Sequence, residues 1–204
     1  MGDLLMQLYN EVAPYEINEG ETERVYQDVN RFLDEHFYKP PWKVFYHPQK
    51  LFERVVKRFR EIPVDHSIKK PKVGIVGEIY VKYSPLGNND LERLLRQEGC
   101  EVITPNILDF FQYTFDSSRH DILKYGGRKI VALTYRFLIW FIEYRRNKVR
   151  KLLKKYNFRP FTSYYELREM GHDMLDHAMH VGEGWLLTAE MIELISIGAP
   201  NIVC

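Results

Sequence analysis

The sequence predicts an α/β fold: a Rossmann-like parallel sheet interrupted by large helical insertions, with a helical N-terminal segment. Two observations predict this class. Short apolar runs rich in β-branched residues occur near residues 72, 101 and 201, and amphipathic helical patterns fill the chain before and between them. The 204 residues, 45% of them hydrophobic, suit one domain with an appendage. We therefore expect a helical segment over residues 1–70 and an α/β domain over residues 71–204.

The N-terminal segment has helical periodicity. Apolar residues recur at helical spacing over residues 22–37 and again over residues 49–61, which predicts two amphipathic helices. Pro40, Pro41 and Pro48 lie between the two patterns. Because proline removes a backbone donor and clashes with the preceding turn, these residues exclude one continuous helix.

The middle of the chain indicates a strand, a helix and a second strand. The run "KVGIVGEIYV", residues 72–81, is typical of a strand that is buried on both faces of a parallel sheet. Asn89 is a natural N-cap, with Glu92 three residues later, for a short helix that Gly99 ends. "CEVITP", residues 100–105, is the second strand, so we expect a right-handed crossover.

Helices are expected in most of the remaining chain. Residues 117–156 form either one long helix or two that are joined at the glycine pair 126–127. The aromatic-rich stretch 133–141 predicts a heavily buried first half. A last helix over residues 184–198 precedes "PNIVC", residues 200–204, which we interpret as a third, buried strand.

Composition and charge argue against several classes of protein. The net charge of +1 gives no general attraction to nucleic acid or to a membrane surface. The most apolar stretch, Ile130 to Ile142, is interrupted by Arg136 and is too short to span a bilayer. Two cysteines make no disulfide framework, and the first residues lack the pattern of a signal peptide. We expect a soluble cytoplasmic protein.

Two glycine-containing turns are candidate ligand-binding sites. Gly77 and Glu78 follow the core of the first predicted strand, and Gly182, Glu183 and Gly184 precede the last predicted helix. Ligands bind at the carboxyl ends of strands in open α/β sheets, and helix N-termini offer free N–H groups to anions. The spacing is not the dinucleotide fingerprint. The alternative is that both turns only provide tight local geometry and a favourable first-turn acid.

A histidine-rich stretch is a candidate metal site. In "GHDMLDHAMH", His172, Asp176 and His180 recur at i, i+4 spacing, which would place them on adjacent turns of one helix. Such residues can hold zinc or iron and would make the protein a metal-dependent hydrolase. The alternative is an ordinary set of Asp–His pairs on a helix surface.

The stretch 145–159 contains many Lys and Arg residues and no acid. A run of this kind can bind nucleic acid, but the neutral charge of the whole chain favours a solvated face or a contact with a partner protein. A non-enzymatic docking module that uses this stretch is therefore an alternative function.

The two cysteines occupy different places in the predicted sheet. Cys100 begins the second strand, where a small half-buried residue fits, and we interpret it as structural. Cys204 ends the third strand, where sites are built. One cysteine cannot hold an iron–sulfur cluster, which needs several thiolates. Its spacing alone identifies Cys204 only as a lone thiol.

Three long stretches resemble a known family. They are "APYEINEGETERVY", "VGIVGEIYVKYSPLGNNDLERLLRQEGCEV" and "HVGEGWLLTAEMIELISIGAPNIVC". Together they resemble the acyl-CoA dehydratase activases, or 2-hydroxyglutaryl-CoA dehydratase activators. The resemblance is to the region of those proteins that is related to 2-hydroxyacyl-CoA dehydratase subunits and double-cubane cluster proteins.

The resemblance implies low-potential electron transfer to an acyl-CoA or another small substrate. Cys204 would ligate an iron–sulfur cluster of the 4Fe-4S or double-cubane type, and other ligands would come from elsewhere in the system. ATP would bind a separate activase region, and the partners would be other regions or subunits of the dehydratase and activase. Gly77, Glu78, Gly182, Glu183 and Gly184 would lie near the cluster, a placement that rests on topology.

The chain departs from the family pattern in two respects. It contains no phosphate-binding motif for ATP and no second cluster cysteine. We therefore expect it to correspond to a fragment of a longer anaerobic enzyme, truncated at the C-terminal end of its α/β domain. We expect such a fragment to be inactive in isolation, with Cys204 as a free thiol.

Overall fold

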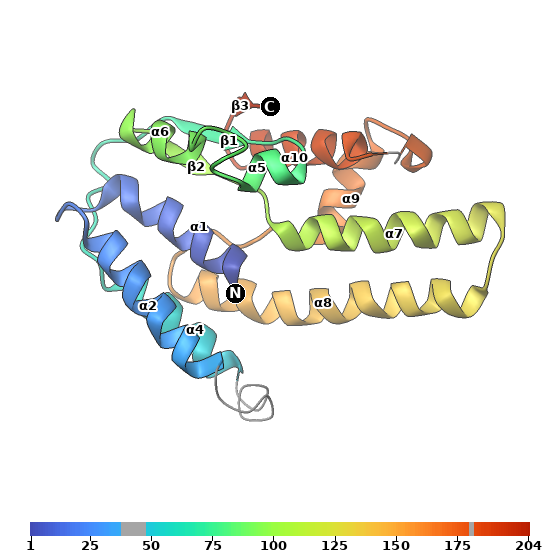
Figure 1. The fold of residues 1–204 in the computed structure, drawn as a ribbon, viewed down its shortest axis with the longest axis horizontal. Coiled ribbons are helices and arrows are strands. Elements are labelled where there is room, and N and C mark those ends of the chain that lie inside the picture. The colour runs from blue at the N-terminus through green and yellow to red at the C-terminus, as the bar shows by residue number, and fades with distance from the viewer. Residues whose placement is uncertain (38–47, 180–181) are drawn as a thin grey trace.

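The structure, a computed structural model, describes residues 1–37, 48–179 and 182–204 and is mostly helical with one small parallel sheet (Figure 1). The helices are α1 (Gly2–Val12), α2 (Glu21–Phe37), α4 (Pro48–Arg60), α5 (Ile79–Tyr83), α6 (Leu91–Gln97), α7 (Ile107–Tyr125), α8 (Lys129–Lys155), α9 (Tyr164–His172) and α10 (Gly184–Ser196), with 3-10 turns η1 (Ala13–Tyr15) and η2 (His177–Met179). The strands are β1 (Lys72–Ile75), β2 (Glu101–Ile103) and β3 (Asn201–Val203). An α/β fold is therefore confirmed at this level. Pro40 and Pro41 lie outside the described residues.

The three strands are parallel and lie in the order β2-β1-β3. In this register Val73 of the central strand pairs with Val102, and Ile75 pairs with Val203. Strands β1 and β2 are buried, but β3 lies at the edge with both Asn201 and Val203 exposed. The expectation that β3 is buried is wrong. Both β2 and β3 have a strand neighbour on one side only among the described residues, but helices α1 and α6 pack against β2 and bury it.

The first strand is shorter than the apolar run 72–81 predicted. It ends at Ile75, and Gly77 has a φ of +144°, a backbone conformation that favours glycine. The side chain of Glu78 then accepts hydrogen bonds from the N–H groups of Tyr80 and Val81 at 2.9 and 3.2 Å. This N-cap begins helix α5, so the second half of the run is helical.

The predicted N-cap of the next helix is also wrong. Asn89 and Asp90 both have positive φ angles, and the N–H of Leu91 donates to Oδ1 of Asn88 at 3.2 Å instead. Glu92 does not form the predicted capping box, since its Oε1 accepts a hydrogen bond from the hydroxyl of Thr104 at 2.6 Å. Asn88 therefore replaces Asn89 as the residue that holds the start of α6.

Two separate helices, α7 and α8, form a hairpin around the glycine pair 126–127 (Figure 1). The expected burial of the stretch 133–141 is wrong for most of its large side chains. Ile139 is buried, whereas Phe137 and Trp140 are 56% and 52% exposed. One face of α8 packs against α7, and the opposite face of this stretch remains open. No helix in the described part of the chain is long and apolar enough to cross a membrane.

Within the part of the chain that the structure describes, three hydrophobic clusters stabilise the fold. The first joins α1, α2 and α4 to the last half of α8, so that Val149 and Leu153 pack with residues of the N-terminal segment. The second surrounds Trp185 between α7, α8, α9 and α10, and the third packs α10 against the sheet. The first cluster therefore contains residues from both sides of position 70, at which the sequence predicted a boundary between the helical segment and the α/β domain.

Gly74 is required where α10 packs against the central strand. A methyl group at this position would lie 2.5 Å from Cδ1 of Leu194, which is 1% exposed and has little room to move. We expect Gly74→Ala to lower the free energy of unfolding by about 1–3 kcal/mol through overpacking. The measurement is urea unfolding, with Gly2→Ala as the control because nothing lies within 4 Å of its added methyl group. Equal stability of the two variants would contradict this packing.

Candidate functional site

The carboxyl edge of the sheet has the topology at which α/β proteins bind ligands. The connection that leaves β1 crosses to β2 on one side, whereas β3 lies on the other side of β1. A crevice forms where connections diverge in this way. The N–H of Val76 donates to the carbonyl of Val203 at 2.9 Å, so Cys204, the next residue, lies at the same edge as the Gly77–Glu78 turn. Cys204 is exposed.

A hydrogen bond brings the two glycine-containing turns together. The N–H of Ile79, directly after Glu78, donates to Oε2 of Glu183 at 3.1 Å. Glu183 comes from the start of α10, more than a hundred residues away along the chain. Partial burial, followed by the negative charge of Glu78, raises the pKa of Glu183 above its usual value. The sequence-predicted residues Gly77, Glu78, Gly182, Glu183 and Gly184 therefore lie in one region of the structure.

A buried ion pair below these turns was missed by the sequence analysis. Nζ of Lys82 on α5 lies 2.8 and 2.9 Å from the two carboxylate oxygens of Glu190 on α10, and both side chains are fully enclosed. Burial raises the pKa of Glu190 to about 7, although the charge of Lys82 opposes this shift. Lys82 lies four residues after Glu78 and Glu190 lies seven after Glu183. Spacings of four and seven place residues on one helix face, and this signal was available in the sequence.

At the carboxyl edge of the sheet, the candidate metal ligand is the thiol of Cys204. The carboxylate of Glu78 already accepts two backbone N–H groups, and that of Glu183 accepts one. Cys100 precedes β2 and therefore lies at the amino end of the sheet, opposite Cys204. In the described ranges, no three His, Cys, Asp or Glu side chains are placed to hold a metal ion. The thiol of Cys204 can supply one ligand, and a cluster here would need the others from elsewhere.

The i, i+4 arrangement of the histidine-rich stretch is not formed. Helix α9 ends at His172, and Asp176 lies in the turn that follows, where its carboxylate accepts the N–H of Ala178 at 2.7 Å. This hydrogen bond lowers the pKa of Asp176. The ring of His172 packs against that of His177 at 5.3 Å. His180 lies outside the described residues.

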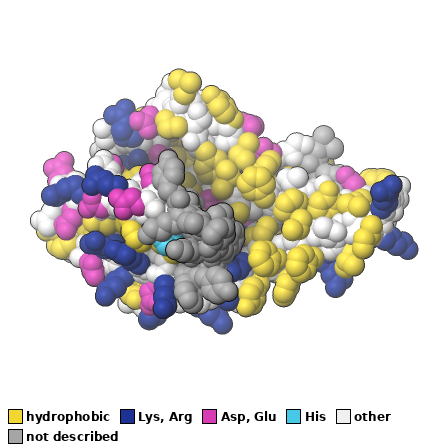
Figure 2. All heavy atoms as spheres, turned by 60° about the horizontal axis from the view of Figure 1, so that its bottom comes forward, with side chains coloured by type: hydrophobic (Ala, Val, Ile, Leu, Met, Phe, Trp, Pro, Cys, Tyr) yellow, Lys and Arg dark blue, Asp and Glu magenta, His cyan; other side chains and the backbone are white. Residues whose placement is uncertain are grey.

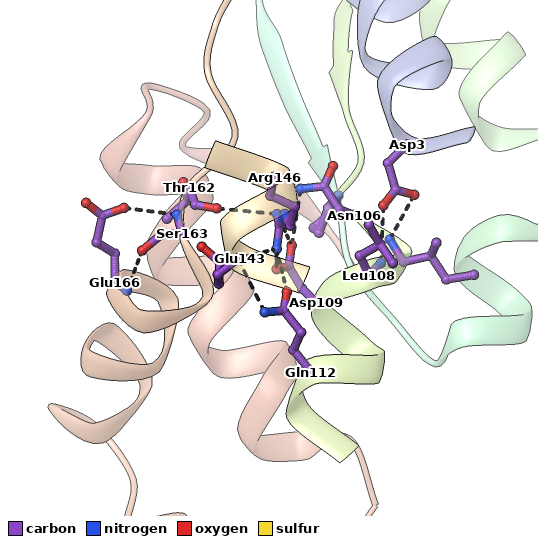
Figure 3. A network of polar contacts seen from close by, with 12 residues as sticks. Asp3, Asn106, Leu108, Asp109, Gln112, Glu143, Arg146, Thr162, Ser163 and Glu166 are labelled. Carbon is purple, nitrogen blue, oxygen red and sulfur yellow. Dashed lines mark hydrogen bonds and ion pairs between the residues drawn. The ribbon is translucent and has the colours of Figure 1, made fainter. Parts of the chain in front are cut away.

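The basic stretch is divided between a buried network and an exposed face. Arg146 donates to the side chains of Asp109, Gln112 and Glu143 and to the carbonyl of Thr162 (Figure 3). Burial lowers the pKa of Arg146, but Asp109 and Glu143 more than offset this effect and raise it overall. The neighbouring Arg145 forms no ion pair with any described residue. The network joins α7, α8 and the segment before α9, which is a structural role.

Comparisons of the chain with protein-family models, with curated proteins and with solved structures found no match. Function is therefore inferred from the residues at the carboxyl edge of the sheet and their geometry.

Proposed function

We propose that the chain is part of an iron–sulfur protein related to the 2-hydroxyacyl-CoA dehydratases and their activators. Its role would be low-potential electron transfer to an acyl-CoA or another small substrate. The observation that carries this proposal is the position of Cys204 at the carboxyl edge of the sheet, level with the Gly77–Glu78 turn. Directly after this turn, the N–H of Ile79 donates a hydrogen bond to Glu183. The strand order β2-β1-β3, which flavodoxin-like doubly wound sheets contain, supports a ligand site at this edge.

In this proposal the chain contributes one ligand and a rigid frame. Cys204 supplies a thiolate, and other regions or subunits of the dehydratase and activase system supply the remaining ligands and bind ATP. A bound cluster would provide one-electron chemistry. Glu78 and Glu183 hold the backbone at the start of α5, and the Lys82–Glu190 pair fixes α5 against α10. These contacts restrict how the edge beside Cys204 can move.

The proposal predicts different effects for the two cysteines. The protein is purified anaerobically together with its accompanying chains, and its iron, its acid-labile sulfide and its charge-transfer absorbance are measured. We expect Cys204→Ala to lose most of the bound iron, because a cluster that loses one thiolate ligand is destabilised. Cys100→Ala, at the opposite edge of the sheet, should retain it. Equal iron and sulfide contents in the two variants would remove Cys204 as a ligand.

A further inference from the structure

Helix α8 exposes an apolar stripe that consists of Leu133, Phe137, Trp140, Phe141 and Tyr144. Their spacing places them on one face of the helix, and each side chain is between 46% and 56% exposed. Figure 2 shows hydrophobic side chains gathered over this part of the molecule. The ring centroids of adjacent aromatic residues lie 5.7 to 6.2 Å apart, so the stripe is pre-ordered. Exposed apolar surfaces of this kind mark interaction sites.

A groove of about 540 Å³ lies beside the stripe, between α7, α8 and α9. Three cations line it, namely Arg119, Arg136 and Arg168, together with one acid, Asp116. Arg168 also pairs with Glu169 at 3.1 Å, so two acids oppose the three cations. Asp116 is buried, and its carboxylate oxygens lie 3.3 Å from Arg119 and 3.7 Å from Arg168. Arg136 is exposed and forms no ion pair with any described residue. The groove therefore carries excess positive charge next to an aromatic surface.

We propose that the α8 stripe and this groove bind an acidic amphipathic helix of another protein. The apolar side chains of that helix would cover Phe137 and Trp140, and its carboxylates would pair with Arg136 and with the arginines of the groove. Beyond the stripe, α8 continues with Arg145, Lys148 and Lys151, which extends the positive surface along its axis. A helix docked in a groove is a common mode of recognition between proteins. This proposal does not depend on the iron–sulfur function.

A second copy of the chain does not fit this surface. The only acid on α8 is Glu143, which is buried and paired with Arg146 and Arg150. Two copies of α8 placed face to face would therefore oppose cation to cation. The acidic helix α2 of a second copy could not cover the stripe either, because its apolar residues Val29 and Leu33 are already buried in the first hydrophobic cluster. A lipid surface fits less well than a helix, because a hollow groove receives protruding side chains.

The test uses a synthetic helical peptide of about 15 residues, which is long enough to cover the whole stripe at 1.5 Å per residue. One peptide has leucine and phenylalanine on one face and glutamate on both flanks, and a matched peptide has lysine in place of glutamate. Fluorescence anisotropy of the labelled peptides measures binding to the chain. We expect saturable binding of the acidic peptide, weakened at least tenfold by Trp140→Ala and by Arg136→Glu. The lysine peptide should bind the wild-type chain more weakly.

Leu86→Ala is the control, since Leu86 is 86% exposed and lies outside the stripe. It should leave binding unchanged. The proposal is overturned if the acidic peptide does not bind, or if both peptides bind equally. Self-association in sedimentation experiments that Trp140→Ala abolishes would instead identify a second copy as the occupant. Binding to phosphatidylserine vesicles that needs Trp140, without peptide binding, would identify a membrane. Both variants alter exposed side chains, and circular dichroism is the check that they remain folded.

Discussion

Replacing Arg146 by methionine is expected to lower the free energy of unfolding by about 3–5 kcal/mol, measured by urea unfolding. Arg146 is 4% exposed and donates to Asp109, Gln112 and Glu143. Methionine fills a similar volume but leaves the carboxylate of Asp109 buried without its cation, whereas Glu143 keeps its ion pair with Arg150. The cost of a buried, uncompensated charge is therefore the physical reason for the expected loss.

Arg145→Met is the matched control for this variant. Arg145 is the adjacent residue of the same helix, is partly exposed and forms no ion pair with any described residue. We expect this control to change stability by no more than about 0.5 kcal/mol, as is usual for surface substitutions. If both variants lose the same stability, the buried network in Figure 3 is not what holds α7, α8 and the segment before α9 together.

The second large effect is expected at the ion pair below the candidate site. Lys82→Met should cost about 3–5 kcal/mol, because it leaves the carboxylate of Glu190 buried without its partner. The double variant Lys82→Met/Glu190→Leu should recover most of this loss, since replacing both charges by apolar groups is often neutral or stabilising. Unfolding of the two single variants and the double variant completes the thermodynamic cycle.

The pH dependence of Lys82→Met distinguishes a buried charge from simple loss of packing. Without Lys82, the pKa of Glu190 should rise above its value of about 7, because the lysine charge lowers it. Between the pKa of Glu190 in the unfolded chain and its higher pKa in the folded variant, the folded variant binds a proton that the unfolded chain does not. The stability of the variant therefore falls as the pH rises through this range. The cost of the substitution should be smaller at about pH 5 than at about pH 8. A cost that is the same at both pH values would contradict the role of the buried charge.

Several elements of the fold were predictable from local pattern. The apolar spacing over residues 22–37 and 49–61 predicted α2 and α4 closely. Gly126 and Gly127 separate α7 from α8, which was one of the two predicted alternatives. The runs at β1, β2 and β3 were identified as strands. Such features follow from backbone geometry and periodicity, which neighbouring residues determine. The end of β1 was missed because the apolar run continues past Ile75. The change from strand to helix comes from the N-cap hydrogen bonds of Glu78, which the hydrophobic pattern does not reveal.

The candidate site was predictable only in outline. The rule that sites form at the carboxyl ends of parallel strands placed Glu78 and Cys204 at one edge of the sheet. In the structure, β1 and β3 are neighbours and run parallel, as this placement requires. The hydrogen bond from Ile79 to Glu183 and the Lys82–Glu190 pair join residues about a hundred positions apart. Helical spacing places Lys82 on the same face as Glu78 and Glu190 on the same face as Glu183, but no local pattern identifies which distant side chain completes such a pair.

The sequence by itself determined the α/β class, most helices, the three strands and the residues available for chemistry. The tertiary structure alone decided which charges are buried together and which apolar face stays open. Trp140 and Ile139 are adjacent in one apolar run, yet Ile139 is buried while Trp140 is half exposed. Adjacent residues of a helix point about 100° apart, so burial depends on which neighbouring helix covers each side. Local periodicity forms the helix, and long-range packing selects its buried face.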